Sequence, residues 1–211
     1  MTNIVGQFAI VCLVFAFFLF LSKYKKNNNS FKIYTIYLGM ISVCEVSSTI
    51  TRHFHKNNMI IGHCDTILQF IFISLFFASM FTNEVQKKIV YFFLILLPLM
   101  LFTRFAIYPE LLFKYDNVET FSTAMLLIVY ATLHLYNMLN HEKKFFYVTV
   151  GLLIYIVGST TIVLTGNILI ALNDMKLYTK IWLFNVLFYL VYQLFVIFEW
   201  YKNYHKKAIT S

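Results

Sequence analysis

Apolar residues occur along this chain in long, nearly unbroken stretches. Seven of them are long enough to cross the hydrocarbon core of a bilayer, which takes about 20 helical residues. The second stretch is the least apolar, because Glu45 and five Ser or Thr residues interrupt it. If the second stretch lay on the membrane surface, six spans would remain. The expected spans lie near Ile4–Leu21, Ile33–Ile50, Ile60–Phe81, Ile89–Tyr108, Phe121–Leu139, Phe145–Ile170 and Ile181–Tyr201.

Composition supports helices that cross a membrane. Hydrophobic residues make up 60% of the chain and charged residues only 12%, whereas a soluble domain carries roughly 25% charged residues. Continuous apolar runs also exclude a transmembrane barrel, whose strands alternate apolar and polar residues. The longest connections, 22–32 and 109–119, are too short for a soluble domain. The sequence therefore predicts an all-α polytopic membrane protein, a seven-helix bundle in which residues 1–211 form a single multi-pass domain.

Basic residues are distributed unevenly between the two sets of loops. With the N-terminus outside, eleven of the seventeen basic residues fall on the cytoplasmic side and six on the other. Six of the nine acidic residues fall on the outer side. Because short cytoplasmic loops are enriched in Lys and Arg, this pattern predicts an outer N-terminus and a cytoplasmic C-terminus. The expected location is the bacterial inner (cell) membrane.

The basic cytoplasmic loops admit two interpretations. The first is topology together with attraction to anionic lipid of the bilayer. The second is a docking surface for an acidic partner or a nucleic acid. The residues expected to face such a partner are Lys23, Lys25, Lys26, Lys87, Lys88, Lys143, Lys144, Lys202, Lys206 and Lys207.

Polar residues inside the expected spans gather toward their outer ends. An ionised side chain within a membrane is costly, so it usually faces the bundle interior and has a structural or functional role. One interpretation is a set of buried hydrogen bonds and ion pairs, such as Glu45 with Arg52 or Arg104. The other is a small-ligand pocket open to the outside. The candidates for this polar pocket are Glu45, Arg52, His63, Asp65, Gln69, Arg104, Asn167 and Asn185.

Metal binding and catalysis receive little support from residue spacing. His53 and His55 form a His-x-His pair and His63 and Asp65 a His-x-Asp pair, but no recognised metal-ligand spacing is present. His134 has no Ser or Cys placed to complete a catalytic triad. We therefore predict no metal, no cofactor and no catalytic residues.

Three glycines mark one face of the sixth span. Gly151, Gly158 and Gly166 are separated by seven and eight residues, which places them on the same side of a helix. Small residues let a second helix approach closely. Packing within the chain and a homo-oligomer through this face are both compatible with the pattern.

Four segments, 57–77, 119–139, 145–159 and 181–200, together resemble small seven-helix membrane proteins of the Bacteroidetes. In those proteins a histidine opens the third span, a GLLIY-like stretch the sixth and an asparagine the seventh, as His63, Gly151 and Asn185 do here. Within that group, the chain is similar in length and helix content to the membrane accessory protein encoded beside the RNA-guided RNase of type VI-B CRISPR systems. The resemblance implies a non-enzymatic regulator that dampens RNA interference in antiviral defence. Its partner, the RNase or its RNA, would contact the basic cytoplasmic loops.

Two alternative functions remain open from the sequence. One is a small-solute or ion transporter, or a sensor domain, that uses the outer polar pocket. The other is an intramembrane lipid hydrolase similar to lysoplasmalogenases, which depend on carboxylates within the bundle. Glu45 and Asp65 match that requirement loosely.

Overall fold

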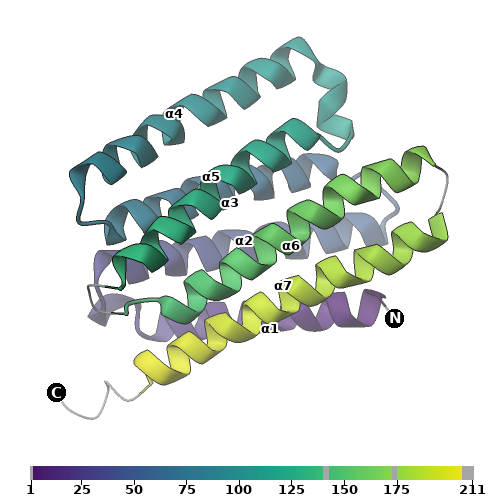
Figure 1. Cartoon of the computed structure of the whole chain (residues 1–211). Coiled ribbons are helices and arrows are strands. Elements are labelled where there is room, and N and C mark those ends of the chain that lie inside the picture. The colour runs from purple at the N-terminus through teal and green to yellow at the C-terminus, as the bar shows by residue number, and fades with distance from the viewer. Residues whose placement is uncertain (1, 140–142, 173–174, 206–211) are drawn as a thin grey trace. The chain divides into compact units, whose positions relative to one another are not determined.

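The computed structural model describes residues 2–139, 143–172 and 175–205. These residues form seven long helices and two short 3-10 turns, η1 (Tyr24–Lys26) and η2 (Pro109–Phe113), with no strand among them. All seven long helices are long and apolar enough to cross a membrane, including the interrupted second one. The helices are α1 (Thr2–Ser22), α2 (Asn29–His53), α3 (Met59–Met80), α4 (Glu84–Ile107), α5 (Asn117–Asn137), α6 (Phe146–Ala171) and α7 (Met175–Asn203) (Figure 1). The chain is a multi-pass membrane protein.

Three helices begin four or five residues before the apolar stretches that predicted them. Asn28 accepts a hydrogen bond from the Phe31 amide at 3.1 Å and so caps α2, and Asn83 caps α4 through the Val85 amide at 2.8 Å. Asp116 does the same for α5 through the Val118 amide at 3.0 Å. Asn and Asp are favoured caps because their side chains satisfy amides that have no partner in the first turn. Hydropathy alone misses these polar first turns.

The chain divides into two compact units, which are described separately. The central unit comprises residues 24–130, with α2, α3, α4 and most of α5. The terminal unit comprises residues 1–23 and 131–211, and so combines α1 with α6, α7 and the end of α5.

Helices α2 and α3 form an antiparallel pair in the central unit. Ser30 near the start of α2 contacts Ser79 near the end of α3, where the two hydroxyl oxygens lie 2.9 Å apart. At the opposite end, the Asn58 amide donates to the Ser48 hydroxyl at 2.6 Å. Between them, buried aromatic rings such as Tyr34 fill the interface. This register places Glu45 of α2 near Asp65 of α3.

In the terminal unit, the three glycines of α6 pack against aromatic side chains of α7. A Cβ atom at Gly151 would lie 2.7 Å from the Phe195 Cβ, and one at Gly158 would lie 2.6 Å from the Phe188 ring. A Cβ atom at Gly166 would lie 3.3 Å from the Tyr178 ring, which is a less severe contact. This arrangement agrees with the intramolecular interpretation of the glycine pattern. A homo-oligomer through the same face stays a prediction, and it would require α7 to move away.

Helix α1 runs parallel to α7 in the terminal unit. A Cβ atom at Gly6 would lie 3.9 Å from Val186, and the Phe20 ring centre is 6.3 Å from that of Tyr204. The start of α1 therefore lies beside the first half of α7, and the end of α1 beside the end of α7. Two parallel neighbours in a membrane must have an odd number of spans between them, and α1 and α7 have five, α2 to α6.

Candidate functional site

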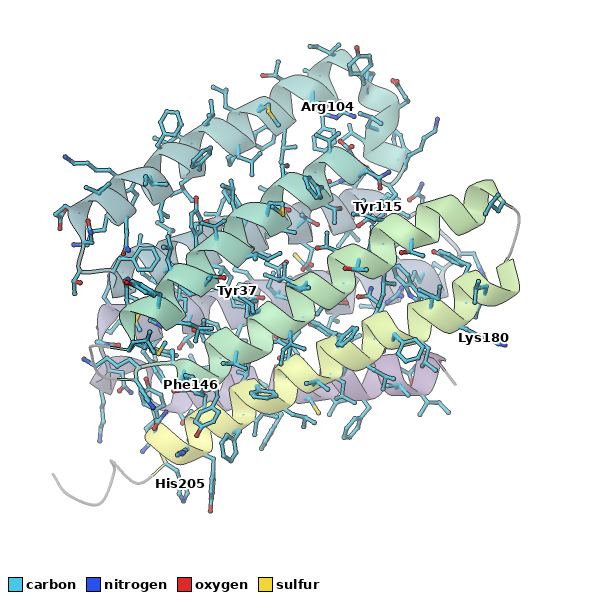
Figure 2. All side chains as sticks on the ribbon, in the orientation of Figure 1. Tyr37, Arg104, Tyr115, Phe146, Lys180 and His205 are labelled. Atoms are coloured by element: carbon cyan, nitrogen blue, oxygen red, sulfur yellow. The ribbon has the colours of Figure 1, made fainter. Side chains whose placement is uncertain are left out.

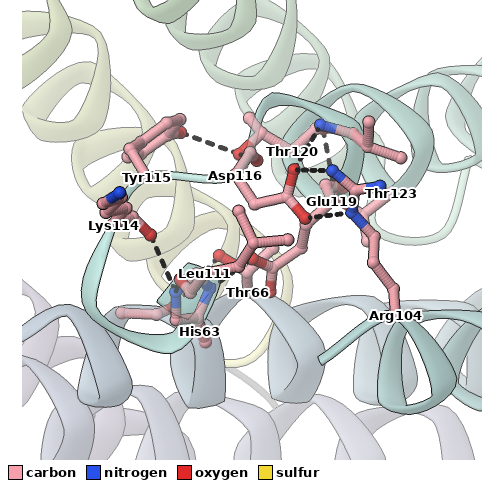
Figure 3. A network of polar contacts seen from close by, with 12 residues as sticks. His63, Thr66, Arg104, Leu111, Lys114, Tyr115, Asp116, Glu119, Thr120 and Thr123 are labelled. Carbon is pink, nitrogen blue, oxygen red and sulfur yellow. Dashed lines mark hydrogen bonds and ion pairs between the residues drawn. The ribbon is translucent and has the colours of Figure 1, made fainter. Parts of the chain in front are cut away.

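The centre of the polar network in the central unit is His63, in the first turns of α3. Its ring is only 7% exposed and its two nitrogens face different partners. Nδ1 contacts a carboxylate oxygen of Glu119 in the first turn of α5. Nε2 lies 3.1 Å from the carbonyl oxygens of both Leu111 and Lys114 (Figure 3). One imidazole thus connects α3 to α5 and to the segment around η2.

A second ion pair lies beside this histidine. The Arg104 guanidinium of α4 binds both carboxylate oxygens of Asp116, at 2.8 and 3.3 Å. Asp116 is 4% exposed and also caps α5, so its carboxylate joins the end of α4 to the start of α5. Two-point contacts between Arg and a carboxylate fix orientation as well as distance. Figure 3 shows both ion pairs in one network.

The structure corrects the expected pairing of Glu45 with an arginine. Arg104 pairs with Asp116 instead, and the Arg52 guanidinium donates to the Thr49 hydroxyl at 3.2 Å. Within the described residues, no basic group comes within ion-pair distance of Glu45. Arg52 contributes only a longer-range attraction to that carboxyl group.

Glu45 and Asp65 form a separate polar pair between α2 and α3. The two carboxyl groups are near enough to interact electrostatically. Asp65 Oδ1 is fully buried and accepts no hydrogen bond within the described part of the chain. One turn further along α3, the Gln69 amide donates to the Tyr37 hydroxyl at 3.2 Å. Two unpaired carboxyl groups inside a membrane span are costly, and the cost falls if one of them carries a proton.

The two remaining candidates lie in the terminal unit. Asn185 is on α7, where its Oδ1 is buried without a hydrogen-bond partner among the described residues. The side chain of Asn167 lies outside the part of the structure that is described. The eight candidates therefore separate into a His63–Arg104 network, a Glu45–Asp65–Gln69 group, the exposed Arg52, and the terminal-unit asparagines.

Sequence reasoning missed the acidic partners of this network. Asp116 and Glu119 were expected in a loop, but they begin α5 and are almost fully buried. Acidic residues are typical of first helical turns, and this signal could have placed them there.

Glu199 was missed as well. This fully buried carboxylate of α7 accepts a hydrogen bond from the Tyr147 amide at 2.9 Å and so caps the start of α6. Its other oxygen accepts from the Asn203 amide at 2.6 Å. Phe145, just before α6, has a φ of 57° and packs its ring near Tyr204. Burial, with the nearby Glu199 carboxylate, raises the pKa of the Tyr204 phenol, so Tyr204 stays neutral.

The histidines of the His-x-His and His-x-Asp pairs do not converge on one point among the described residues. His53 lies in the last turn of α2 and His55 follows it, and both side chains are exposed. Both nitrogens of His63 already contact other groups, Nδ1 the Glu119 carboxylate and Nε2 two backbone carbonyl oxygens. No group of three His, Cys, Asp or Glu side chains within the described ranges is arranged to hold a metal ion.

Lysines gather at one end of each unit, and in the central unit this is the end opposite the His63 network. In the central unit, Lys25, Lys26 and Lys88 are exposed, and Lys87 pairs with Glu84 at 2.7 Å. In the terminal unit, Lys23, Lys143, Lys144 and Lys202 lie at the common end of α1, α6 and α7. Figure 2 labels Phe146 at the start of α6 and His205 beyond the end of α7. Lys206 and Lys207 fall outside the described residues. We call the lysine cluster of the central unit the central lysine end and that of the terminal unit the terminal lysine end, and the two together the lysine ends.

The fold and site define the class of protein, a seven-helix multi-pass membrane protein with a polar network at one end of its central unit. Comparison of the sequence with models of known families, with curated proteins and with solved structures found no match.

Proposed function

We propose that this chain is a non-enzymatic regulatory membrane protein that acts through a partner bound at its lysine ends. In its most specific form, the partner is a type VI-B CRISPR RNA-guided RNase or its RNA, and the chain dampens RNA interference in antiviral defence. The observation that carries the proposal is a contrast between the two ends of the central unit. At one end, His63 pairs with Glu119 and Arg104 pairs with Asp116, whereas the lysines at the other end are largely open to solvent.

The central lysine end has little acidic compensation. Glu84 lies beside it, and that carboxylate is bound to Lys87. Exposed lysines without nearby acids create a positive surface that attracts anionic partners and raises their association rate. A phosphate backbone or an acidic protein surface meets that requirement.

The terminal lysine end adds an ordered cation. The Lys202 ammonium donates to the Tyr147 hydroxyl and lies 4.8 Å from the centre of the same ring. This contact holds the lysine against the start of α6 while leaving it exposed. A cation fixed in this way loses less side-chain entropy when it meets an anion.

The proposed orientation places both lysine ends in the cytoplasm of a bacterial cell and the N-terminus outside. The excess of basic residues in short loops supports this orientation. A reporter fused after residue 211 tests it: a fusion active only in the cytoplasm agrees, and one active only in the periplasm contradicts it.

The function is tested by expressing the full chain beside a type VI-B RNase that targets a phage transcript. We expect the chain to raise plaque formation, and the triple variant Lys25→Gln, Lys26→Gln, Lys88→Gln to lose most of that effect. Glutamine removes charge without adding a negative one, and the reporter fusion verifies that the topology is kept. Lys56→Gln with Lys180→Gln, exposed lysines away from the lysine ends, is the matched control. No effect of the unmodified chain on interference would reject the CRISPR form of the proposal.

A second candidate function, proton or cation transport, is favoured by the Glu45–Asp65 pair. Both acids of the predicted pocket belong to this pair. Among the described side chains, no basic residue forms an ion pair with either of them. In proteoliposomes that contain a pH-sensitive dye, transport predicts a proton flux that Glu45→Gln and Asp65→Asn each abolish. Glu84→Gln, which alters an exposed acid, should leave the flux unchanged. Absence of flux with the unmodified protein would exclude this function.

A further inference from the structure

We propose that His63 and Glu119 form a binding site for a single proton, and that loss of this proton releases the segment Pro109–Lys114 from α3. The site goes beyond the proposed function, because it lies at the opposite end of the central unit from that unit's lysines and needs no partner. It would make the non-lysine end of the central unit responsive to the pH of the compartment that it faces.

The argument begins with the partners of the His63 ring. Nε2 faces two backbone carbonyl oxygens, which have no proton to give, so Nε2 must carry a hydrogen and donate it. Nδ1 faces a carboxylate oxygen of Glu119. This contact is satisfied in two ways, by a protonated ring that donates to ionised Glu119 or by a neutral ring that accepts from protonated Glu119. Both arrangements contain the same number of protons.

Removing that proton leaves no satisfactory arrangement. A neutral ring has one donor and one acceptor nitrogen. If Nε2 keeps the hydrogen, the Nδ1 lone pair faces an anionic carboxylate. If Nδ1 keeps it, the Nε2 lone pair faces the carbonyl oxygens of Leu111 and Lys114. Glu119 is 2% exposed and its second oxygen is buried without a partner in the described structure, so water does not relieve the repulsion.

The other groups around His63 do not replace the missing proton. From α4, the Phe105 ring packs 5.0 Å from the imidazole and offers no charge, and Arg104 is bound to Asp116. Asp116 at the start of α5 adds negative charge near Glu119. On α3 itself, Asp65 lies two residues away, and the Thr66 hydroxyl donates to the Gly62 carbonyl. The contact between His63 and Glu119 therefore depends on its own proton.

The segment that would be released is held to α3 mainly by this ring. His63 binds carbonyl groups at Leu111 and Lys114, and the exposed Asn57 amide donates to the Phe113 carbonyl at 3.1 Å. If Nε2 loses its hydrogen, the carbonyl groups of Leu111 and Lys114 separate from the ring. If Nδ1 loses its hydrogen bond, Glu119 separates from the ring instead. The segment and the first turn of α5 would then move more freely.

A spin label at Glu110, an exposed position of η2, tests the proposal in the full-length protein in lipid bilayers. Cys12, Cys44 and Cys64 are replaced by serine, and Glu110→Cys carries the label. Between about pH 5 and about pH 10, we expect the ratio of mobile to immobile label to rise roughly tenfold, the effect of losing one charge-assisted hydrogen bond. A label at Thr82→Cys, in the exposed connection at the opposite end of the unit, should not change.

The decisive variant is Glu119→Gln. Its amide can donate to Nδ1 while Nε2 still donates to the carbonyl groups, so the label should stay immobile across the whole pH range. His63→Phe, which removes both contacts, should leave the label mobile at every pH. A flat response in the unmodified protein, or the same transition in Glu119→Gln, would overturn the proposal. If His63→Phe fails to fold, the isosteric Glu119→Gln still decides the result.

Discussion

Replacing Gly151 with alanine is expected to destabilise the α6–α7 pair, although alanine is the better helix former by about 1 kcal/mol. The added Cβ would lie 2.7 Å from the Cβ of Phe195, an atom attached directly to the α7 backbone. Side-chain rotation cannot move that atom away, so the two helices must separate. Overpacking of this kind typically costs about 1–3 kcal/mol. We expect a lower midpoint of thermal unfolding in detergent.

Gly62→Ala is the matched control for this substitution. Gly62 also lies in a membrane-spanning helix, but a Cβ at that position meets no atom within 4 Å. The variant should therefore be as stable as the unmodified protein or slightly more stable. Equal midpoints for Gly151→Ala and Gly62→Ala would show that α6 and α7 do not pack through the glycine face.

Replacing Glu199 with alanine is expected to have the second large effect. The carboxylate is fully buried and accepts hydrogen bonds from the Tyr147 amide and the Asn203 side chain. Alanine would remove two hydrogen bonds from half-buried donors to a charged acceptor, each worth about 1.5–3 kcal/mol. It would also remove the cap of α6 and leave a cavity. Unfolding in increasing concentrations of a denaturing detergent should show a clear loss of stability.

Glu199→Gln separates hydrogen bonding from charge. Glutamine keeps the volume and one acceptor oxygen, so the Tyr147 amide can remain satisfied. The lost attraction between a carboxylate and a helix N-terminus is worth about 0.3–1 kcal/mol. We expect a small loss of stability. If glutamine destabilised the protein as much as alanine, the negative charge itself would be the essential feature, and the capping explanation would be wrong.

The seven helices could be predicted from hydropathy because each span must satisfy its backbone internally within the membrane. Even α2, with Glu45 in its second half, has enough apolar residues to follow this rule. The predicted starts were late where a polar cap opens the helix, as at Asn28 and Asn83. Apolar length therefore locates a span but not its first turn.

The partners within the site could not be predicted in the same way. His63 and Arg104 were identified as unusual because ionisable side chains are costly in a membrane. Their partners are set by the path of the chain: Glu119 is 56 residues from His63, and Asp116 reaches Arg104 only because η2 reverses the chain. Glu45 was paired with Arg52 or Arg104 on the basis of helical spacing and depth, and neither determines which side chains are in contact.

The parallel contact between α1 and α7 has a consequence for biosynthesis. Helix α1 leaves the ribosome before the other six helices and packs against α7, so this neighbour does not exist until all six have been translated. The central unit, which is continuous in sequence, can assemble in the meantime. During that interval α1 must reside in the lipid without its permanent partner, and its high apolar content allows this.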